Sequence, residues 1–433
     1  MAPRYSSVAV IGAGPSGISA VKALSEEKAF NRIQVFDRRH RVGGTWIYDE
    51  EPEPFSIYSS QPVRETPEKL PRSLPSASEN LTARTGIYPS LDSNVGSQVM
   101  AFTYKAFPPV KSATSINRFG KGNPTHPFAT VAEYLEDIAE PFSHLFTFDT
   151  HVERVEKGDY WWQDTFDAVV VATGHYGVPY VPNIAGLGET FAALPQRFEH
   201  SKAYRSPEDY VNKKVVVAGG NVSASDTVSE IHNIVSGPLY VSQRSYNEVL
   251  KDAWELPNVV RKPQITRVSV GPDNLIRVSF ADGTEVDGIE KVHFGTGYRL
   301  SYPFLRPDPV TPSGRLAGFY QHVFNVADPS LAVVGQVKAA ISFRVYEYQA
   351  VAVKRLQYKG PTSQFHEIKP DFKEYFDFLR GVTGEPAPGT DAYEPPAWQD
   401  EWALLGFGVL TLKQKWWKEL KEKDQKKPVQ AKL

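Results

Sequence analysis

The sequence predicts an α/β fold with two Rossmann-like dinucleotide-binding domains. A short apolar run near the N-terminus ends in a glycine-rich turn at residues 12–17 (GAGPSG), and a second such turn begins at Gly219 in the middle of the chain. The chain of 433 residues is also longer than one simple hydrophobic core usually supports. We therefore expect two domains, each built around one glycine-rich turn.

The N-terminal turn has the complete context of a dinucleotide site. The apolar residues 8–11 predict a strand, a helical pattern follows the turn, and the next predicted strand ends at Asp37. In this motif Gly12 permits the tight turn, Gly14 lets the backbone approach a pyrophosphate, and Gly17 lets the helix pack on its strand. A carboxylate at Asp37 would accept hydrogen bonds from ribose hydroxyls. A glycine loop without a ligand is the alternative, and the order strand, turn, helix, strand disfavours it.

The segment that follows continues the same site. Residues 41–46 (RVGGTW) contain two glycines that would let the chain pass close to an adenine dinucleotide. Trp46 is equally well explained as a plain core residue. The candidate cofactor-binding residues of this first site are Gly12, Gly14, Ser16, Gly17, Asp37, Arg38, Gly44, Thr45 and Trp46.

The second half of the chain repeats this plan. Its predicted strands lie at 213–217, 239–242, 265–270, 275–280 and 292–294, with the third and fourth forming a hairpin. The last strand runs into residues 295–297 (GTG), just as a predicted strand at 166–172 runs into Thr173 and Gly174. An internal repeat of this kind is more specific than either motif alone. It adds the candidate cofactor-binding residues Thr173, Gly174, Gly219, Gly220 and Gly297.

The second fingerprint departs from the first at informative positions. Asn221 stands where the second glycine belongs, and Ala224 takes the third position. Asn tolerates a positive φ better than most residues, so we expect the turn to survive. Arg244, after the next strand, replaces the acidic ribose ligand, and a guanidinium can grip the 2′-phosphate of NADPH. An ordinary solvated charge is the alternative reading of Arg244.

Composition excludes several other functions. The formal net charge of −2 predicts no attraction to nucleic acid or to an acidic membrane. No apolar stretch approaches the length of a membrane span, and the first residues do not form a signal peptide, so we expect a cytoplasmic protein. Cysteine is absent, which excludes dithiol redox chemistry, iron–sulfur clusters and Cys-based zinc sites. We predict no metal site.

Taken together, these motifs resemble the flavin-containing monooxygenase family within the class B flavin-dependent monooxygenases. The resemblance covers nearly the whole chain. It rests on GAGPSG at 12–17, VGGTW at 42–46, YxxLxxN at 88–94, ATGHY at 172–176 with Pro179 and Pro182, FGTGY at 294–298 and EYQA at 347–350.

The identifying signature of that family, FxGxxxHxxx(Y/F), is only half present. His200 and Tyr204 match its second half, whereas Leu194 and Gln196 stand where Phe and Gly are expected. Baeyer–Villiger monooxygenases carry Trp at the position of Tyr204, so the signature favours the flavin-containing monooxygenase branch.

The resemblance implies a cofactor pair and a reaction. NADPH would reduce FAD, O₂ would then give a flavin C4a-hydroperoxide, and a nucleophilic N or S of a small molecule would attack its distal oxygen. Asn94 would lie by the flavin edge as the one catalytic residue, and Tyr176, Ser223, Ser225 and Arg244 would hold NADP. His175 and His200 are not expected to be general bases. The alternatives are Baeyer–Villiger oxygenation of a ketone and a flavoprotein that only carries or senses electrons.

The expected domains follow from the order of the motifs. An FAD-binding domain would comprise residues 1–176 and 295–433, and the NADPH-binding domain would be inserted at 177–294. Smaller expectations are an amphipathic helix at 128–142, a hairpin at 151–162 and a polar loop at 73–83.

Partners other than the small-molecule substrate are few. A homodimer is compatible with the sequence. The last residues, Ala431, Lys432 and Leu433, are close to the Ser-Lys-Leu signal read by the peroxisomal import receptor, and a chance tripeptide is the alternative. A peroxisomal address would replace the cytoplasmic one if that signal is read.

Overall fold

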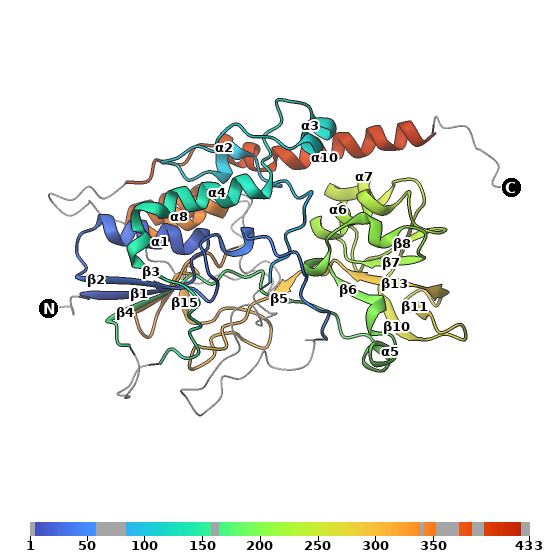
Figure 1. Cartoon of the computed structure of the whole chain (residues 1–433), viewed down its shortest axis with the longest axis horizontal. Coiled ribbons are helices and arrows are strands. Elements are labelled where there is room, and N and C mark those ends of the chain that lie inside the picture. Colours follow the sequence, from blue (N-terminus) through green and yellow to red (C-terminus); the bar gives the residue numbers. More distant parts are fainter. Residues whose placement is uncertain are drawn as a thin grey trace.

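Two Rossmann-like lobes lie side by side in this computed structural model, which describes residues 5–57, 84–156, 164–337, 342–351, 372–382 and 394–425 (Figure 1). A seven-stranded sheet forms the centre of the first lobe and a five-stranded sheet that of the second. The predicted α/β fold with two Rossmann-like domains is confirmed.

The sheet of the first lobe has the order β15-β16-β17-β4-β1-β2-β3. Its strands are β1 (Ser7–Ile11), β2 (Arg32–Phe36), β3 (Phe146–Thr147), β4 (Ala168–Val171), β15 (Phe319–Tyr320), β16 (Phe324–Asn325) and β17 (Leu331–Val333). β1 pairs in parallel with β2 and β4, and β17 pairs in parallel with β4. The chain therefore returns to its first sheet after building the second one. The exact boundaries at 176 and 294 stay predictions.

Helices cover one face of this sheet (Figure 1). They are α1 (Pro15–Glu26), α2 (Ser97–Met100), α4 (Phe128–Ala139), α8 (Ser342–Val351) and α9 (Phe372–Val382). α1 forms because its apolar residues recur at helical spacing, and Ile18 and Val21 are fully buried against the sheet. The predicted helix at 128–142 is observed as α4, which ends at Ala139 and continues as a 3-10 helix from Glu140 to Leu145.

The second lobe is continuous in sequence. Its parallel sheet has the order β6-β13-β7-β8-β9, formed by β6 (Phe198–His200), β7 (Val215–Ala218), β8 (Leu239–Ser242), β9 (Val259–Lys262) and β13 (Lys291–Phe294). α6 (Val222–Ile231) and α7 (Lys251–Trp254) cover one face. The other face packs on the antiparallel strands β10 (Ile265–Val270), β11 (Ile276–Phe280) and β12 (Glu285–Ile289) and on α5 (Leu187–Ala193).

Several segments join the lobes. β5 (Val178–Pro179) and β14 (Tyr298–Arg299) form an antiparallel ribbon where the chain enters and leaves the second lobe. The long C-terminal helix α10 (Glu401–Gln425) runs across the top of both lobes, beside α2 and α3 (Ala113–Phe119) and above α7 (Figure 1). It places Trp402 in the core of the first lobe and Trp417 in the core of the second.

Three local expectations need correction or lie outside the described residues. The predicted hairpin at 151–162 is wrong in its first arm, because Val155 makes an isolated bridge to Leu305 instead, and residues 157–163 are not described. The strands β15, β16 and β17 were not predicted at all. The polar loop at 73–83 and the C-terminal tripeptide at 431–433 lie outside the described residues.

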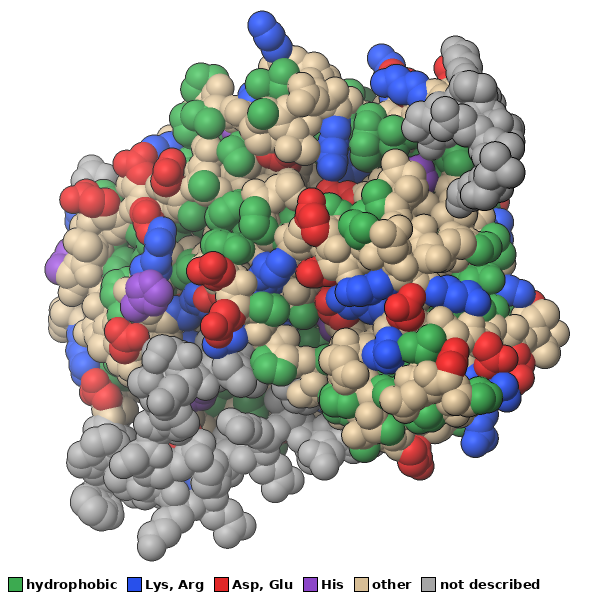
Figure 2. All heavy atoms as spheres, turned by 45° about the vertical axis from the view of Figure 1, so that its right-hand side comes forward, with side chains coloured by type: hydrophobic (Ala, Val, Ile, Leu, Met, Phe, Trp, Pro, Cys, Tyr) green, Lys and Arg blue, Asp and Glu red, His purple; other side chains and the backbone are tan. Residues whose placement is uncertain are grey.

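The surface carries interspersed charges. On the face shown in Figure 2, acidic and basic side chains alternate with apolar ones, as the net charge of −2 would suggest. Within the described ranges, no helix combines the length and apolarity that a bilayer crossing requires.

The packing of the second lobe leads to a stability prediction. A Cβ at Gly295 would lie 2.9 Å from the backbone Cα of Ala224, so Gly295→Ala forces β13 and α6 apart. We expect it to destabilise the protein by about 1–3 kcal/mol. The matched control is Gly188→Ala in α5, where a Cβ would meet nothing within 4 Å and should be neutral or stabilising. Urea unfolding of both variants checks this; equal midpoints would contradict it.

Candidate functional site

The first glycine turn lies at the carboxyl ends of β1 and β4, where parallel sheets of this kind bind ligands. Gly12 has φ +108°, and a Cβ there would lie 2.6 Å from the carbonyl oxygen of Ala172. A Cβ at Gly17 would lie 1.8 Å from the carbonyl oxygen of Gly12. The turn itself therefore requires both glycines, with or without a ligand.

Gly14 is a different case. It is the N-cap of α1 with φ −79°, and no side chain caps the helix. A Cβ at Gly14 would meet only Gly44, at an ordinary distance of 3.5 Å. The space in front of the helix N-terminus is therefore open, and free N–H groups point into it. These features fit a pyrophosphate, which would be the reason for glycine at this position.

Asp37 ties the end of β2 to this turn. Its carboxylate accepts hydrogen bonds from the backbone N–H of Ala13 (2.6 Å) and of Arg39 (2.8 Å). Burial raises the pKa of Asp37, although both hydrogen bonds oppose the shift. The carboxylate thus lies beside the glycine turn, where the sequence predicts a ribose ligand. Its neighbour Arg38 is partly buried, and burial lowers the pKa of its guanidinium.

The segment 43–46 docks on the same turn. The N–H of Gly43 donates to the carbonyl oxygen of Ala13 at 3.0 Å, and a Cβ at Gly44 would lie 2.8 Å from the Cα of Gly14. Thr45 is exposed, whereas Trp46 packs against the core of the first lobe. The core interpretation of Trp46 therefore has direct support.

A third glycine completes this edge of the sheet, and sequence analysis missed it. Gly335 follows β17 with φ +90°, and a Cβ there would lie 2.8 Å from the Cβ of Ser16. The hydroxyl of Ser16 donates to the carbonyl oxygen of Ala172 at 3.1 Å, and the exposed Thr173 and Gly174 follow directly. The signal was available: residues 331–334 are a short apolar run that ends in glycine, like the runs before Gly12 and Gly219.

The second glycine turn reproduces the first with its small residues exchanged. Gly219 has φ +151°, and a Cβ there would lie 2.4 Å from the carbonyl oxygen of Gly295. In the first lobe glycine is on the helix (Gly17) and alanine at the strand end (Ala172). In the second lobe alanine is on the helix (Ala224) and glycine at the strand end (Gly295). In each lobe, the place where the helix passes the end of the neighbouring strand therefore has one alanine and one glycine.

Asn221 does not need the positive φ that we expected. It is the N-cap of α6 with φ −129°, and its side-chain oxygen accepts from the N–H of Val222 at 2.9 Å. Gly14 has the same extended backbone at the N-cap of α1. Any residue can adopt this conformation, so the replacement leaves the turn intact and adds a polar side chain at the helix N-terminus.

Arg244 borders the second turn. A Cβ at Gly220 would lie 3.4 Å from the carbonyl oxygen of Ser245 and 3.8 Å from Cγ of Gln243, so the loop on both sides of Arg244 touches the turn. Arg244 is exposed, and the described part of the chain offers it no ion pair. Its guanidinium is therefore available to an anionic ligand beside the turn.

The two predicted serines of α6 differ. Ser223 is exposed at the start of the helix. Ser225 is fully buried, and its hydroxyl donates to the carbonyl oxygen of Val222 at 2.9 Å. The expectation that Ser225 contacts NADP directly is not supported by this placement, because the hydroxyl faces the helix interior.

Tyr176 and Gly297 flank the connecting ribbon, and His200, at the end of β6, contacts it. Tyr176 is half exposed and meets Tyr298 edge to face, with ring centroids 5.5 Å apart. Nε2 of His200 donates to the carbonyl oxygen of Gly297 (3.0 Å), while Nδ1 accepts from the N–H of Lys202 (3.1 Å). Burial and the charge of His293 lower the pKa of His200 to about 3. His200 is thus a neutral structural residue, as expected.

His175 also has a structural contact. Its Nδ1 lies 3.0 Å from the carbonyl oxygen of Gly335, and the ring is buried. His175 and His200 therefore both have structural contacts, and neither is placed as a general base beside a glycine turn. Among the described residues, no cluster of His, Asp or Glu could hold a metal ion.

Asn94 lies in an exposed bend before α2. The N-cap of α2 is Gly96, so a role in capping this helix does not explain why an asparagine stands at position 94. The buried Ser93 next to it receives a hydrogen bond from the N–H of His126 at 3.1 Å and fixes the bend. The amide of Asn94 is therefore held at the surface with its hydrogen-bonding groups accessible.

The half-matched signature has a clear structural meaning in its second half. Tyr204 is buried, and its hydroxyl donates to Glu230 of α6 at 2.5 Å. Leu194, where the signature has Phe, is buried in the core of the second lobe. Although the first half of the signature is degenerate, its Phe position is therefore still occupied by an apolar core residue.

Comparisons with known proteins agree with this geometry. The model of a family described as flavin-binding monooxygenase-like matches residues 147–260 and 249–363, and an NAD(P)-binding Rossmann-like domain matches residues 10–58. A flavin-containing monooxygenase of Arabidopsis thaliana, FMO GS-OX-like 9, is 30% identical over 436 residues, covering 94% of this chain and 88% of that protein.

Two further similarities are more distant. The flavin-containing monooxygenase ustF2 of Aspergillus flavus is 25% identical over 428 residues, covering 82% of each chain. The solved structure of S-allyl-L-cysteine S-oxygenase from Allium sativum has a TM-score of 0.68 at 22% identity, covering 97% of each chain, and supports the fold.

The open space at Gly14 leads to a prediction of cofactor retention. Gly14→Val should fold, because the protein leaves room for a side chain, yet should lose FAD, because that side chain would occupy the approach of the pyrophosphate. Gly12→Val should instead fail to fold. Flavin absorbance per protein and circular dichroism check both; a yellow Gly14→Val protein with normal flavin content would exclude this position for the pyrophosphate.

The exposed Arg244 leads to a prediction of coenzyme choice. Arg244→Ala should raise the KM for NADPH about 10- to 100-fold and leave that for NADH nearly unchanged, since only NADPH offers a 2′-phosphate for a charge-assisted contact. Arg267→Ala, an exposed arginine on β10 of the same lobe, is the control. Equal effects of Arg244→Ala on both coenzymes would remove the assigned role.

Proposed function

This chain belongs to the flavin-containing monooxygenase family, and from that premise we propose that it transfers one oxygen atom of O₂ to a nucleophilic N or S of a small molecule. As a flavin monooxygenase it is an oxidoreductase that uses FAD, NADPH and O₂. FAD, when bound, accepts a hydride from NADPH and activates O₂. The chain's own residues bind and orient the two dinucleotides and exclude water.

One observation carries the proposal. The chain contains two glycine turns of the same construction, one beside the carboxylate of Asp37 and the other beside the loop that carries Arg244, an exposed residue with no ion pair among the described residues. A carboxylate suits a ribose with free hydroxyls, and a guanidinium suits a ribose that carries a 2′-phosphate. We assign FAD to the first turn and NADPH to the second on this difference.

The binding roles follow from the geometry. At the first turn the N–H groups of α1 would hold the FAD pyrophosphate, with Gly14 providing close approach and Gly12, Gly17 and Gly44 permitting the tight backbone of the turn. At the second turn Ser223, Gly220 and Arg244 would hold NADPH, and Tyr176 would contact it from the ribbon. Ser225 would act only by stabilising α6.

Oxygen transfer to N or S needs no acid–base pair from the protein, because the substrate itself supplies the electron pair. This agrees with the structural roles of His175 and His200. Tyr204 favours this reaction over Baeyer–Villiger oxygenation of a ketone, since enzymes of that type carry Trp in the signature. Homodimerisation and peroxisomal import through residues 431–433 stay predictions.

Product analysis tests the reaction class. We expect the purified yellow protein to consume NADPH and O₂ in equal amounts and to oxygenate a tertiary amine or a thioether from a panel that also contains a cyclic ketone. Ester or lactone formation alone would establish Baeyer–Villiger chemistry instead. Consumption of NADPH with only H₂O₂ formed on every compound would favour a flavoprotein that carries electrons without oxygenating.

Asn94 supplies the sharpest test of oxygen transfer. A side-chain amide near the flavin can donate a hydrogen bond where negative charge develops on oxygen, and loss of one such donor costs about 3 kcal/mol. We predict that Asn94→Ala retains FAD and oxidises NADPH at the normal rate, but releases most of the oxygen as H₂O₂. The measurement is the ratio of product to NADPH consumed, with H₂O₂ assayed in parallel.

Asn94→Asp is the isosteric comparison. A carboxylate has the same shape but cannot donate, and it repels developing negative charge, so this variant should be uncoupled as well. An unchanged ratio of product to NADPH in both variants would show that Asn94 has no part in oxygen transfer.

A further inference from the structure

Three of the chain segments that join the lobes near the ribbon meet at His200 and Lys202. Nε2 of His200 donates to the carbonyl oxygen of Gly297, on the segment that leaves the second lobe. Nζ of Lys202 donates to the carbonyl oxygen of Gly177 (2.7 Å), on the segment that enters it. The same ammonium pairs with Glu53, on a third segment. One short 3-10 turn, Ser201–Ala203, thus gathers every one of these connections.

The third segment, residues 49–57, connects the two lobes like a strap, and we call it the strap. At its start Asp49 pairs with Arg39 of the first lobe at 2.8 Å. Near its end Phe55 stacks on Phe294 of the second lobe, with centroids 5.6 Å apart and planes 16° apart. The strap is therefore anchored in both lobes, and Glu53 lies between the anchors.

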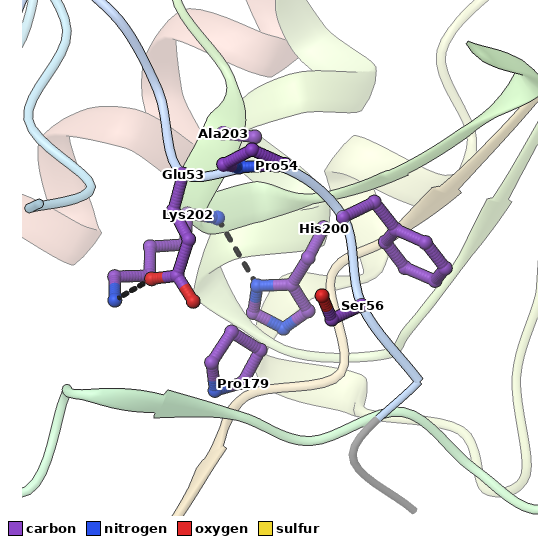
Figure 3. Close-up of a pocket in the computed structure, with 8 residues that line it drawn as sticks. Glu53, Pro54, Ser56, Pro179, His200, Lys202 and Ala203 are labelled. Atoms are coloured by element: carbon purple, nitrogen blue, oxygen red, sulfur yellow. Dashed lines mark hydrogen bonds and ion pairs between the residues drawn. The ribbon is translucent and has the colours of Figure 1, made fainter. Parts of the chain in front are cut away.

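Lys202 and Glu53 form a buried ion pair. Their side chains are 2% and 6% exposed. Figure 3 shows the ammonium of Lys202 directed at the carboxylate of Glu53, while its backbone N–H meets the ring of His200. Burial lowers the pKa of Lys202, and Glu53 opposes that shift. Both charges are therefore compensated inside a small pocket between the lobes.

A buried ion pair of this kind adds little net stability to the fold. Desolvation of two charges offsets much of their attraction, and apolar residues of similar volume often serve at least as well. The ion pair adds a directional constraint, because the ammonium of Lys202 must contact the carboxylate of Glu53 and the carbonyl oxygen of Gly177 at the same time. The orientation of the second lobe relative to the strap is thereby restricted more tightly than apolar packing would do.

We propose that Lys202 is a positioning residue, whose contacts with Glu53 and Gly177 set the orientation of the NADPH-binding lobe and thereby the rate at which NADPH reduces the flavin. The proposal rests on the proposed function. Lys202 touches neither glycine turn, so its loss should change how the nicotinamide is presented rather than how tightly NADPH binds.

The test uses Lys202→Met, which keeps the length of the side chain but cannot pair, and Glu53→Gln, which keeps its shape. Lys291→Met is the control, because Lys291 pairs with Glu199 at 2.6 Å within the second lobe alone, where the two side chains are 11% and 14% exposed. All three variants lose one partly or fully buried ion pair. Only Lys202→Met and Glu53→Gln remove a contact that joins the two lobes.

Anaerobic stopped-flow titration with NADPH separates binding from reduction. For Lys202→Met and Glu53→Gln we expect the limiting rate of flavin reduction to fall about tenfold or more, with the Kd for NADPH changed less than about twofold. Lys291→Met should retain the wild-type rate even if it unfolds at a lower temperature. A reduction rate in Lys202→Met and Glu53→Gln equal to that of Lys291→Met would overturn the proposal.

Hydrogen exchange on the flavin-free protein gives a second readout that does not need catalysis. Peptides covering residues 176–181 and 295–300 should exchange about tenfold faster in Lys202→Met and Glu53→Gln, and at the wild-type rate in Lys291→Met. Unchanged exchange in the first two variants would also overturn the proposal. If wild-type flavin is not reduced by NADPH at all, the proposed function fails, whereas the exchange data still decide whether Lys202 holds the lobes.

Discussion

The close backbone contact between each glycine turn and the end of the neighbouring parallel strand is the constraint on which the rest of the structure depends. At Gly12 the turn passes the carbonyl oxygen of Ala172, and at Gly219 it passes that of Gly295, with no room for a Cβ at either position. Because the turn lies so close, the first N–H groups of α1 and α6 open onto the carboxyl edge of their sheets. Asp37 and the loop that carries Arg244 can then lie beside their turns, and our assignment of the two dinucleotides rests on the difference between these residues.

The second constraint is the orientation of the two lobes relative to each other. Hydride transfer requires a nicotinamide and a flavin in contact, and in the proposed assignment each is bound by a different lobe. The chain meets this requirement with contacts of two kinds. Apolar residues such as Trp402 and Trp417 of α10 bury surface on both lobes, and polar contacts such as those of Lys202 restrict angles. Lys413 on the same helix also pairs with Asp226 of α6 at 2.7 Å, so the helix that follows the second glycine turn is tied to the C-terminal helix.

Much of this architecture could be predicted from the sequence, because each turn sits in a strand–helix–strand repeat with strong local signals. β8 was predicted to the residue, and the hairpin of β10 and β11 within one. The strands β15, β16 and β17 were missed, because strands of two or three residues have no readable alternation, and they form by pairing with one another and, for β17, with β4. Val155 was assigned to a hairpin, although its partner Leu305 is distant in sequence.

Site residues were predictable to the extent that backbone geometry dictates them. The glycines at positions 12, 17 and 219 are where a motif requires them, whereas the direction of a side chain on a helix is not in the motif. Ser225 shows this: it lies two residues after the exposed Ser223, and the helical turn rotates it into the core. Lys202 carried no signal, since a buried lysine cannot be told from a solvated one until its partners Glu53 and Gly177 are placed.

The return of β17 to the first sheet has a consequence for biosynthesis. The five strands of the second sheet are encoded without interruption, and Trp417 of α10 joins the core of that lobe only at the end of synthesis. The first lobe must wait for β17, which is translated long after its neighbour β4. At usual elongation rates that delay is on the order of ten seconds or more. During this interval β4 presents an unpaired edge, so nascent chains halted between these strands should depend on chaperones.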